Sequence, residues 1–256
     1  MLRRRFLLGL IGCLLASRMG VAAPTLRLHL ATLEWRPYVA LSLPAGGITS
    51  VIVARAAALT GRELQVDYFP WVRAMKIGGE DPAFDGYFPS YFVVERSRRC
   101  YFSHPIGTST VGLAFLSNAP IAWNTSDDLR KVRIGLVLGY SNGREFDQQV
   151  AENRLEIEYS SNDLANIRKL LAGRTQAIVI DQLVLRYLLA TEPGLGPRAQ
   201  QILFHAKPIA QLSLHVCFHR SASGKATQEA FDQALQRLDL PRIESEYFQK
   251  FNAARK

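Results

Sequence analysis

The sequence lacks the motifs that mark a metal enzyme or a nucleotide-binding enzyme. Its 256 residues include five histidines and three cysteines, which are too scattered to form a metal-ligand set. The pair His215 and His219 lies in a segment that alternates like a strand and lacks the glutamate of a zinc-protease helix. The Gly-x-Ser-x-Gly, P-loop and dinucleotide-binding motifs are also absent. We therefore expect no metal, no other cofactor and no enzymatic activity.

The sequence also lacks a hydrophobic run of the roughly 20 residues that a membrane-spanning helix needs. A shorter apolar stretch, residues 6–16, follows the basic run 3–5 and precedes small residues up to position 23. This order is typical of a cleavable export signal, and we place the cleavage after Ala22. We expect the mature protein to be soluble.

Two other export features fit the same segment. The stretch from Leu10 to Cys13 resembles a lipobox, which would leave a lipid anchor on Cys13. The stretch from Arg3 to Leu7 matches the core of a twin-arginine signal, and Arg18 adds a late positive charge. The sequence leaves both alternatives open.

Basic residues do not cluster enough to indicate a nucleic-acid partner. The formal charge of +9 falls to +5 when the four arginines of residues 1–22 are removed. The one dense basic run that remains contains Arg96, Arg98 and Arg99, whereas a nucleic-acid surface needs a longer basic stripe. The two remaining cysteines, Cys100 and Cys217, fit either a disulfide or two buried thiols.

The spacing of apolar residues predicts two α/β blocks of similar size. Strands alternate with helices in each block, which is typical of parallel sheets with crossover helices. We expect Ser50 to cap the first helix and Gly78-Gly79 to end the second. The first block has expected strands at 25–32, 64–69 and 85–91 and helices at 50–60 and 71–77. The second has strands at 132–138, 155–159 and 175–180 and helices at 144–152 and 160–172, and the chain ends with a strand at 212–218 and helices at 226–238 and 243–251.

Several motifs occur in an order that resembles one protein family. They are Trp35-Arg36-Pro37-Tyr38, Asp85-Gly86, the segment from Glu95 to Pro105, the segment from Gly135 to Ser141, and the segment from Leu171 to Asp181. This order resembles the family 3 extracellular solute-binding proteins, the substrate-binding components of ABC importers, mostly for amino acids. The resemblance implies a type II periplasmic binding protein-like α/β fold with two lobes joined by two hinge strands. It also implies a monomer in the periplasm that partners an inner-membrane ABC permease.

The resemblance divides the chain as follows. Residues 1–22 form the signal peptide, 23–109 the first part of lobe 1, 110–208 lobe 2, and 209–256 the return to lobe 1 with the C-terminal helices. The hinge crossings fall near 106–112 and 206–213. The ligand is expected between the lobes, where the carboxyl ends of the strands meet.

The same resemblance implies a site for a small carboxylate-bearing solute, such as an amino acid or a related compound. Arg96 matches the carboxylate-binding arginine, since a guanidinium is shaped for this anion. Ser141 and Tyr140 lie on a strand-to-helix turn whose N–H groups would contact the same carboxylate, with Asn142 beside them. Asp181 matches the ammonium-binding aspartate. The residues alone favour other roles. They indicate a solvated surface charge for Arg96, a turn residue for Ser141 and a helix cap for Asp181.

Aromatic residues are expected to complete the pocket. Trp35 matches the stacking position of lobe 1, and Trp71 lies at a wall position that is commonly smaller. Tyr91 replaces a small hydroxyl residue of the family, which favours a narrower and more aromatic pocket. Core packing is the alternative role for either tryptophan.

Two further functions fit the same fold. Cyclohexadienyl dehydratases resemble these binding proteins, and in such an enzyme the residue at Asp181 would act as a general acid with a pKa raised by burial. A sensory module would bind the solute and report to a membrane protein without transport.

Overall fold

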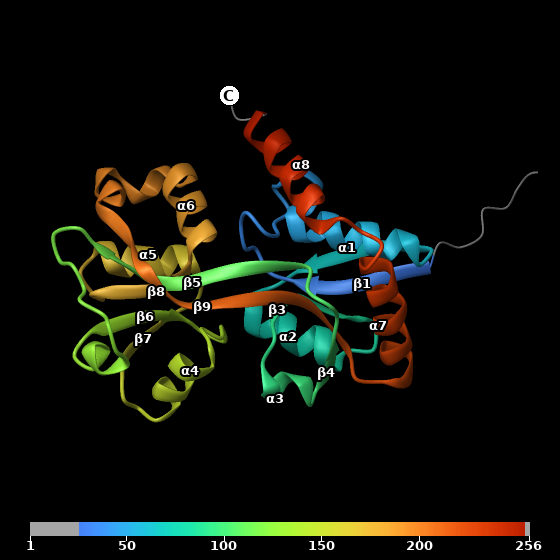
Figure 1. Ribbon diagram of the computed structural model, residues 1–256, viewed down its shortest axis with the longest axis horizontal. Helices are drawn as coiled ribbons and strands as arrows, with labels where there is room; N and C mark the ends of the chain where they lie inside the picture. The colour runs from blue at the N-terminus through green and yellow to red at the C-terminus, as the bar shows by residue number, and fades with distance from the viewer. Residues whose placement is uncertain (1–25, 254–256) are drawn as a thin grey trace, which may run out of the picture.

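The computed structural model describes residues 26–253, which fold into two α/β lobes (Figure 1). The predicted export signal, its cleavage site and Cys13 lie outside the described residues. Lobe 1 contains β1 (Leu26–Thr32), α1 (Ile48–Leu59), β2 (Arg62–Tyr68), α2 (Trp71–Glu80), β3 (Gly86–Tyr91), α3 (Val94–Ser97), β4 (Cys100–Phe102), α7 (Ala222–Leu235) and α8 (Leu240–Ala253). Lobe 2 contains β6 (Arg133–Val137), α4 (Arg144–Ala151), β7 (Glu156–Ser160), α5 (Asp163–Leu171), β8 (Ala177–Asp181) and α6 (Gln182–Thr191).

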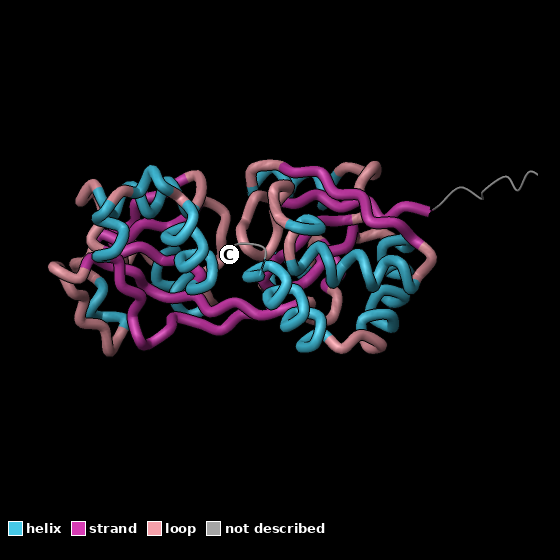
Figure 2. Tube along the Cα trace, turned by 90° about the horizontal axis from the view of Figure 1, so that it is seen from above, coloured by secondary structure: helices cyan, strands magenta, loops and turns pink. Residues whose placement is uncertain are grey.

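Two long strands, β5 (Gly107–Leu116) and β9 (Ile202–His219), run through both lobes (Figures 1 and 2). They pair antiparallel with each other and stand at the centre of one sheet of order β2-β1-β3-β9-β5-β8-β6-β7, with β4 added on β9. Each lobe contributes three mutually parallel strands to this sheet, as the predicted crossover pattern requires. The chain therefore crosses between the lobes twice. The domain boundaries predicted at residues 110 and 209 fall inside β5 and β9.

The prediction of a short strand at 212–218 was wrong in length, because β9 begins ten residues earlier. Pro208 lies inside β9, opposite Gly112, where the register of β5 and β9 shifts. A proline without an N–H is tolerated at such an irregularity, so it does not end the strand. The strand β5 was expected only from the resemblance, as a hinge crossing near 106–112, because its first four residues contain no apolar alternation.

Two predicted helix signals were also wrong. Ser50 lies within α1 rather than before it, and its hydroxyl donates to the carbonyl of Gly46 at 3.0 Å. The helix α2 continues through Gly78 and Gly79 to Glu80. A Cβ at Gly78 would lie 2.5 Å from the Gly86 carbonyl oxygen, so this glycine allows α2 to pack closely on β3.

Each lobe has a core of side chains from the central strands and the helices that cover them. Every residue of β3 and of β8 is buried, as expected for strands covered on both faces. Phe88 and Phe218 fill the centre of lobe 1, whereas Ile134 and Ile178 fill that of lobe 2. The helices α7 and α8 pack against α1, which returns the C-terminal segment to lobe 1.

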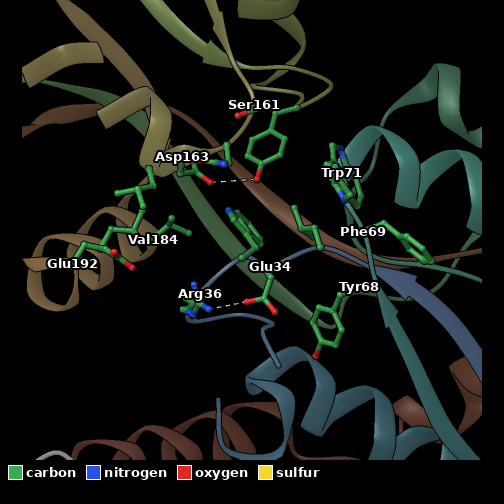
Figure 3. Close-up of a pocket in the computed structure, with 16 residues that line it drawn as sticks. Glu34, Arg36, Tyr68, Phe69, Trp71, Ser161, Asp163, Val184 and Glu192 are labelled. Carbon is green, nitrogen blue, oxygen red and sulfur yellow. Dashed lines mark hydrogen bonds and ion pairs between the residues drawn. The ribbon is translucent and has the colours of Figure 1, made fainter. Parts of the chain in front are cut away.

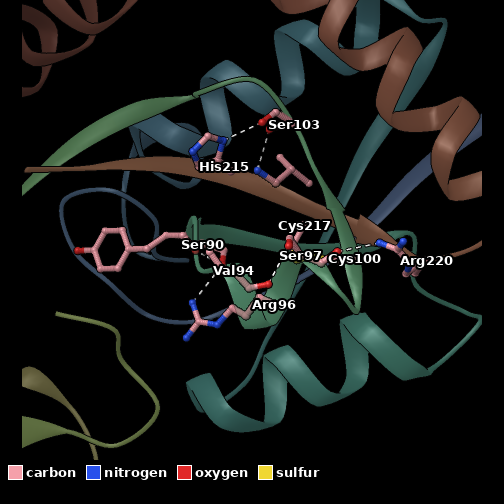
Figure 4. The surroundings of a disulfide bond; sticks show 11 residues. Ser90, Val94, Arg96, Ser97, Cys100, Ser103, His215, Cys217 and Arg220 are labelled. Carbon is pink, nitrogen blue, oxygen red and sulfur yellow. Dashed lines mark hydrogen bonds between the residues drawn. A yellow bond between two sulfur atoms is a disulfide. The ribbon is translucent and has the colours of Figure 1, made fainter. Parts of the chain in front are cut away.

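A disulfide joins Cys100 of β4 to Cys217 of β9 (Figure 4). The two Cα atoms are 5.5 Å apart, within the range that disulfides require. Of the two alternatives for these cysteines, the structure thus has the disulfide. Within residues 26–253, no helix is long and apolar enough to cross a membrane, and no three potential metal-ligating side chains come together.

Candidate functional site

Two neighbouring cavities lie where the lobes meet. The smaller has a volume of about 20 Å³ and the larger a volume of about 580 Å³. Both are lined by residues of lobe 1 and lobe 2, and they share the side chains of Leu33, Trp35, Trp71 and Tyr140. The smaller is also lined by Pro89, Tyr91, Arg96 and Ser141. Six of the eight predicted ligand-binding residues therefore converge on one small cavity, and Asn142 and Asp181 do not line it.

Among residues 26–253, Arg96 is the one charged residue that lines the small cavity. Its guanidinium donates to the Ser90 hydroxyl at 3.3 Å (Figure 4). Across the lobe boundary it also donates to the Gly139 carbonyl, at 2.9 Å. It also lies 5.7 Å from the Trp71 ring centroid. Burial lowers the pKa of Arg96, and a guanidinium still remains charged at neutral pH. The nearby Arg98 and Arg99 are exposed, so Arg96 differs from its neighbours in the same basic run.

The Gly139 carbonyl holds the lobes together at this point. It accepts hydrogen bonds from the Arg96 guanidinium and from the Trp71 indole N–H, the latter at 3.0 Å. Gly139 has a φ of +81°, and a Cβ there would lie 2.8 Å from a methyl group of Val72. A glycine thus allows the turn of lobe 2 to lie directly against α2.

The predicted donors of the lobe 2 turn are bound to a carboxylate of the protein itself. The Ser141 hydroxyl donates to Asp147 of α4 at 2.5 Å, and the Asn142 backbone N–H donates to Asp147 at 2.9 Å. The charge of Asp147 also favours the charged form of Arg96. Asp147 therefore occupies donors that the sequence assigns to the solute carboxylate.

Asp181 serves as the N-terminal cap of α6. One carboxylate oxygen accepts the backbone N–H groups of Leu183 and Val184, at 2.7 and 2.8 Å. The other accepts the hydroxyls of Tyr38 and Ser109, at 3.0 and 2.6 Å. Burial raises the pKa of Asp181, and these hydrogen bonds oppose the increase. Asp181 lines neither cavity, so the structure does not place it opposite Arg96 in a common space.

Aromatic rings from both lobes line both cavities. Trp35 stacks on Tyr38 with ring centroids 4.4 Å apart, and it meets Tyr91 and Tyr140 edge to face at 6.0 and 6.4 Å. The Tyr91 hydroxyl is hydrogen-bonded to Ser109 at 2.6 Å, at the start of the hinge strand β5. The indole N–H of Trp35, which is 5% exposed, has no hydrogen-bond partner of normal geometry among residues 26–253.

The sequence analysis singled out none of the acidic residues of the larger cavity, of which Asp163 is the buried one (Figure 3). It is the first residue of α5, follows the capping residue Asn162, and is only 6% exposed. The Tyr140 hydroxyl donates to its carboxyl at 3.2 Å. Burial raises the pKa of Asp163 to about 7, with a further contribution from the charge of Asp181. In the sequence, this aspartate shows only the pattern of a helix start.

No protein-family model and no curated protein matches the sequence. Solved structures do match. The ligand-binding core of GluR0 in complex with L-glutamate has a TM-score of 0.72 at 15% identity, over 89% of this chain and 99% of that chain. A histidine kinase sensor domain with similarity to periplasmic binding proteins has a TM-score of 0.74 at 15% identity, over 87% and 96%. An ancestral arginine-binding protein bound to arginine has a TM-score of 0.70 at 14% identity, over 88% and 98%.

These likenesses agree with the predicted fold over nearly the whole described chain. At 14 to 15% identity they show the fold and leave the ligand open, because glutamate and arginine differ in side-chain charge. The protein therefore has the fold of the type II periplasmic binding proteins, with two α/β lobes joined by two hinge strands.

Proposed function

We propose that this protein is a family 3 solute-binding protein that captures a small carboxylate-bearing solute between its lobes for an ABC importer. The observation that carries this proposal is the position of Arg96. It is a half-buried cation at the boundary between the two lobes, and aromatic side chains line the same cavity. An arginine in such a place attracts a carboxylate strongly because water competes little with the pair. The export signal expected at residues 1–22 agrees with a periplasmic protein.

The small cavity also indicates how the solute enters. A space of about 20 Å³ is too small for an amino acid, so the lobes must separate before binding. Separation breaks the two hydrogen bonds to the Gly139 carbonyl, which frees donors of Arg96 and Trp71. The backbone of β5 and β9 links the lobes and is the place where a hinge motion would bend.

The experiment that tests the proposal is calorimetric titration of the twenty standard amino acids. We expect micromolar binding of at least one of them and a loss on the order of 3 to 5 kcal/mol in the Arg96→Ala variant. Arg98→Ala is the matched control, because Arg98 belongs to the same basic run and is exposed. Equal affinity in the Arg96→Ala variant and the wild type would refute the proposal.

A sensory function is the second candidate, favoured by the likeness to a histidine kinase sensor domain. Deleting the gene distinguishes the two. Loss of solute uptake supports transport, whereas normal uptake with an altered transcriptional response to the solute supports sensing. The dehydratase alternative receives less support, because all contacts of the Asp181 carboxyl are internal and it lines neither cavity. Incubation with prephenate tests for that turnover.

A further inference from the structure

The larger cavity carries more acidic than basic side chains. Its charged lining residues are Glu34, Arg36, Asp163 and Glu192. Arg36 pairs with Glu34 at 2.9 Å (Figure 3), and within residues 26–253 neither Asp163 nor Glu192 has an ion-pair partner. Two carboxyl groups of lobe 2 thus border a space of about 580 Å³ without a cation to balance them.

The remaining wall suits a cation as well. Aromatic rings contributed by both lobes line the space, namely Trp35, Tyr68, Phe69, Trp71 and Tyr140. The face of an aromatic ring attracts an ammonium or guanidinium group, and the attraction is stronger where water is excluded. An anionic group of the solute would be repelled in this cavity, because it would lie beside carboxyl groups that have no ion-pair partner.

Asp163 is the best-positioned of these carboxyl groups. Its carboxyl is buried and accepts the Tyr140 hydroxyl, whose own pKa is raised by burial so that it keeps its proton. The unpartnered N–H of Trp35 lies close enough to lower the pKa of Asp163. Two donors therefore lie near a carboxyl group whose ionisation is opposed by burial and by the charge of Asp181. A positively charged group of the solute would stabilise the ionised form of Asp163.

We propose that the larger cavity is a cation subsite in which Asp163 pairs with a positively charged group of the solute. The inference rests on the proposed function, and it narrows the solute class. The solute carries a carboxylate for Arg96 in the smaller cavity and an ammonium or guanidinium group for Asp163 in the larger one. Amino acids with a cationic side chain belong to this class.

The test compares L-lysine with L-norleucine, which has the same carbon chain without the terminal ammonium, and with L-glutamate. Affinities are measured by calorimetry for the wild type and for the variants Asp163→Asn, Glu145→Gln and Arg96→Ala. Glu145 is the matched control, since it is an exposed acid of lobe 2 that lines neither cavity.

We expect the wild type to bind L-lysine at least about tenfold more tightly than L-norleucine. Asp163→Asn should abolish this preference and leave L-norleucine binding intact, which shows that the variant is folded. Glu145→Gln should keep the preference. Three results would overturn the inference. They are equal affinities of the wild type for L-lysine and L-norleucine, a preference for L-lysine that survives in Asp163→Asn, and the lack of any probe that binds with a Kd below about 1 mM.

The two proposals fail separately. If Arg96→Ala binds all probes as the wild type does, the carboxylate assignment is refuted, while the comparison of L-lysine with L-norleucine still reports on Asp163. If Arg96→Ala weakens all probes equally and L-norleucine binds as well as L-lysine, only the cation subsite is refuted.

A pH series gives an independent readout. Asp163 must lose its proton to pair with a cation, and its pKa is raised to about 7. The affinity for L-lysine should therefore rise about tenfold from pH 6 to pH 8, whereas that for L-norleucine should stay constant. The rise should be absent in Asp163→Asn. A constant affinity for L-lysine in the wild type would contradict the pairing.

Discussion

The burial of Asp163 predicts a stability that depends on pH. Its pKa is about 7 in the folded protein, against an ordinary value of 3.8. Below pH 3.8 the carboxyl is protonated in both the folded and the unfolded state, so it costs nothing. As the pH rises to 7, the unfolded chain releases this proton while the folded protein keeps it, and folding becomes less favourable. Above pH 7 the cost is constant.

The magnitude follows from the difference in pKa. About three pKa units correspond to about 4 kcal/mol above pH 7, and the part that arises between pH 5 and pH 8 is about 3 kcal/mol. The substitution Asp163→Asn removes the titration and keeps an oxygen that can accept the Tyr140 hydroxyl. We therefore expect the variant, free of solute, to gain about 3 kcal/mol relative to the wild type between pH 5 and pH 8.

Urea unfolding at pH 5, 6, 7 and 8 measures this gain directly. The wild type and the Glu145→Gln variant should lose stability in parallel as the pH rises, because Glu145 is exposed. A difference between Asp163→Asn and the wild type that is the same at all four pH values would refute the reasoning. Such a constant difference would show that Asp163 is already ionised in the folded protein at pH 5.

Three further predictions concern packing and covalent structure. Gly78→Ala should destabilise the protein by more than about 2 kcal/mol, because its Cβ would lie 2.5 Å from the Gly86 carbonyl oxygen. Gly79→Ala should be neutral or stabilising, because no atom would lie closer than 3.8 Å to its Cβ. Urea unfolding of both variants measures the difference. Gly139→Ala should hold the lobes apart, which small-angle X-ray scattering would show as a larger radius of gyration; an unchanged radius would contradict the role of the Gly139 carbonyl. Replacing both Cys100 and Cys217 by alanine should cost about 4 to 5 kcal/mol, because the disulfide closes a loop with a sequence separation of 117, and an unchanged urea midpoint would refute this.

The sequence predicted the elements whose pattern is local. Strands β1, β3 and β8 are short apolar or alternating runs, and their ends carry turn residues, so that the strand pattern was visible. Local patterns did not show the full hinge strands, because Pro208 interrupts one and the other begins with the polar segment Gly107–Thr110. Their pairing joins residues about a hundred positions apart, which no local pattern records.

The candidate site was predictable where motif order was informative, and the prediction failed where packing within lobe 2 decides which groups meet. The resemblance indicated Arg96, and the structure places it on the lobe boundary beside Trp71. It did not indicate that Asp147 would bind the Ser141 hydroxyl, since that contact depends on the angle at which α4 leaves its turn. The place of Asp163 in the large cavity likewise depends on the packing of α5 against the rest of lobe 2.

The disulfide has one more consequence. Its two cysteines bracket every element of lobe 2, from the start of β5 to the last residues of β9. A protease that cuts a surface segment of lobe 2 therefore leaves two fragments that the disulfide still links covalently. On a gel without reductant the nicked chain migrates as one intact species, and only thiol treatment releases its halves.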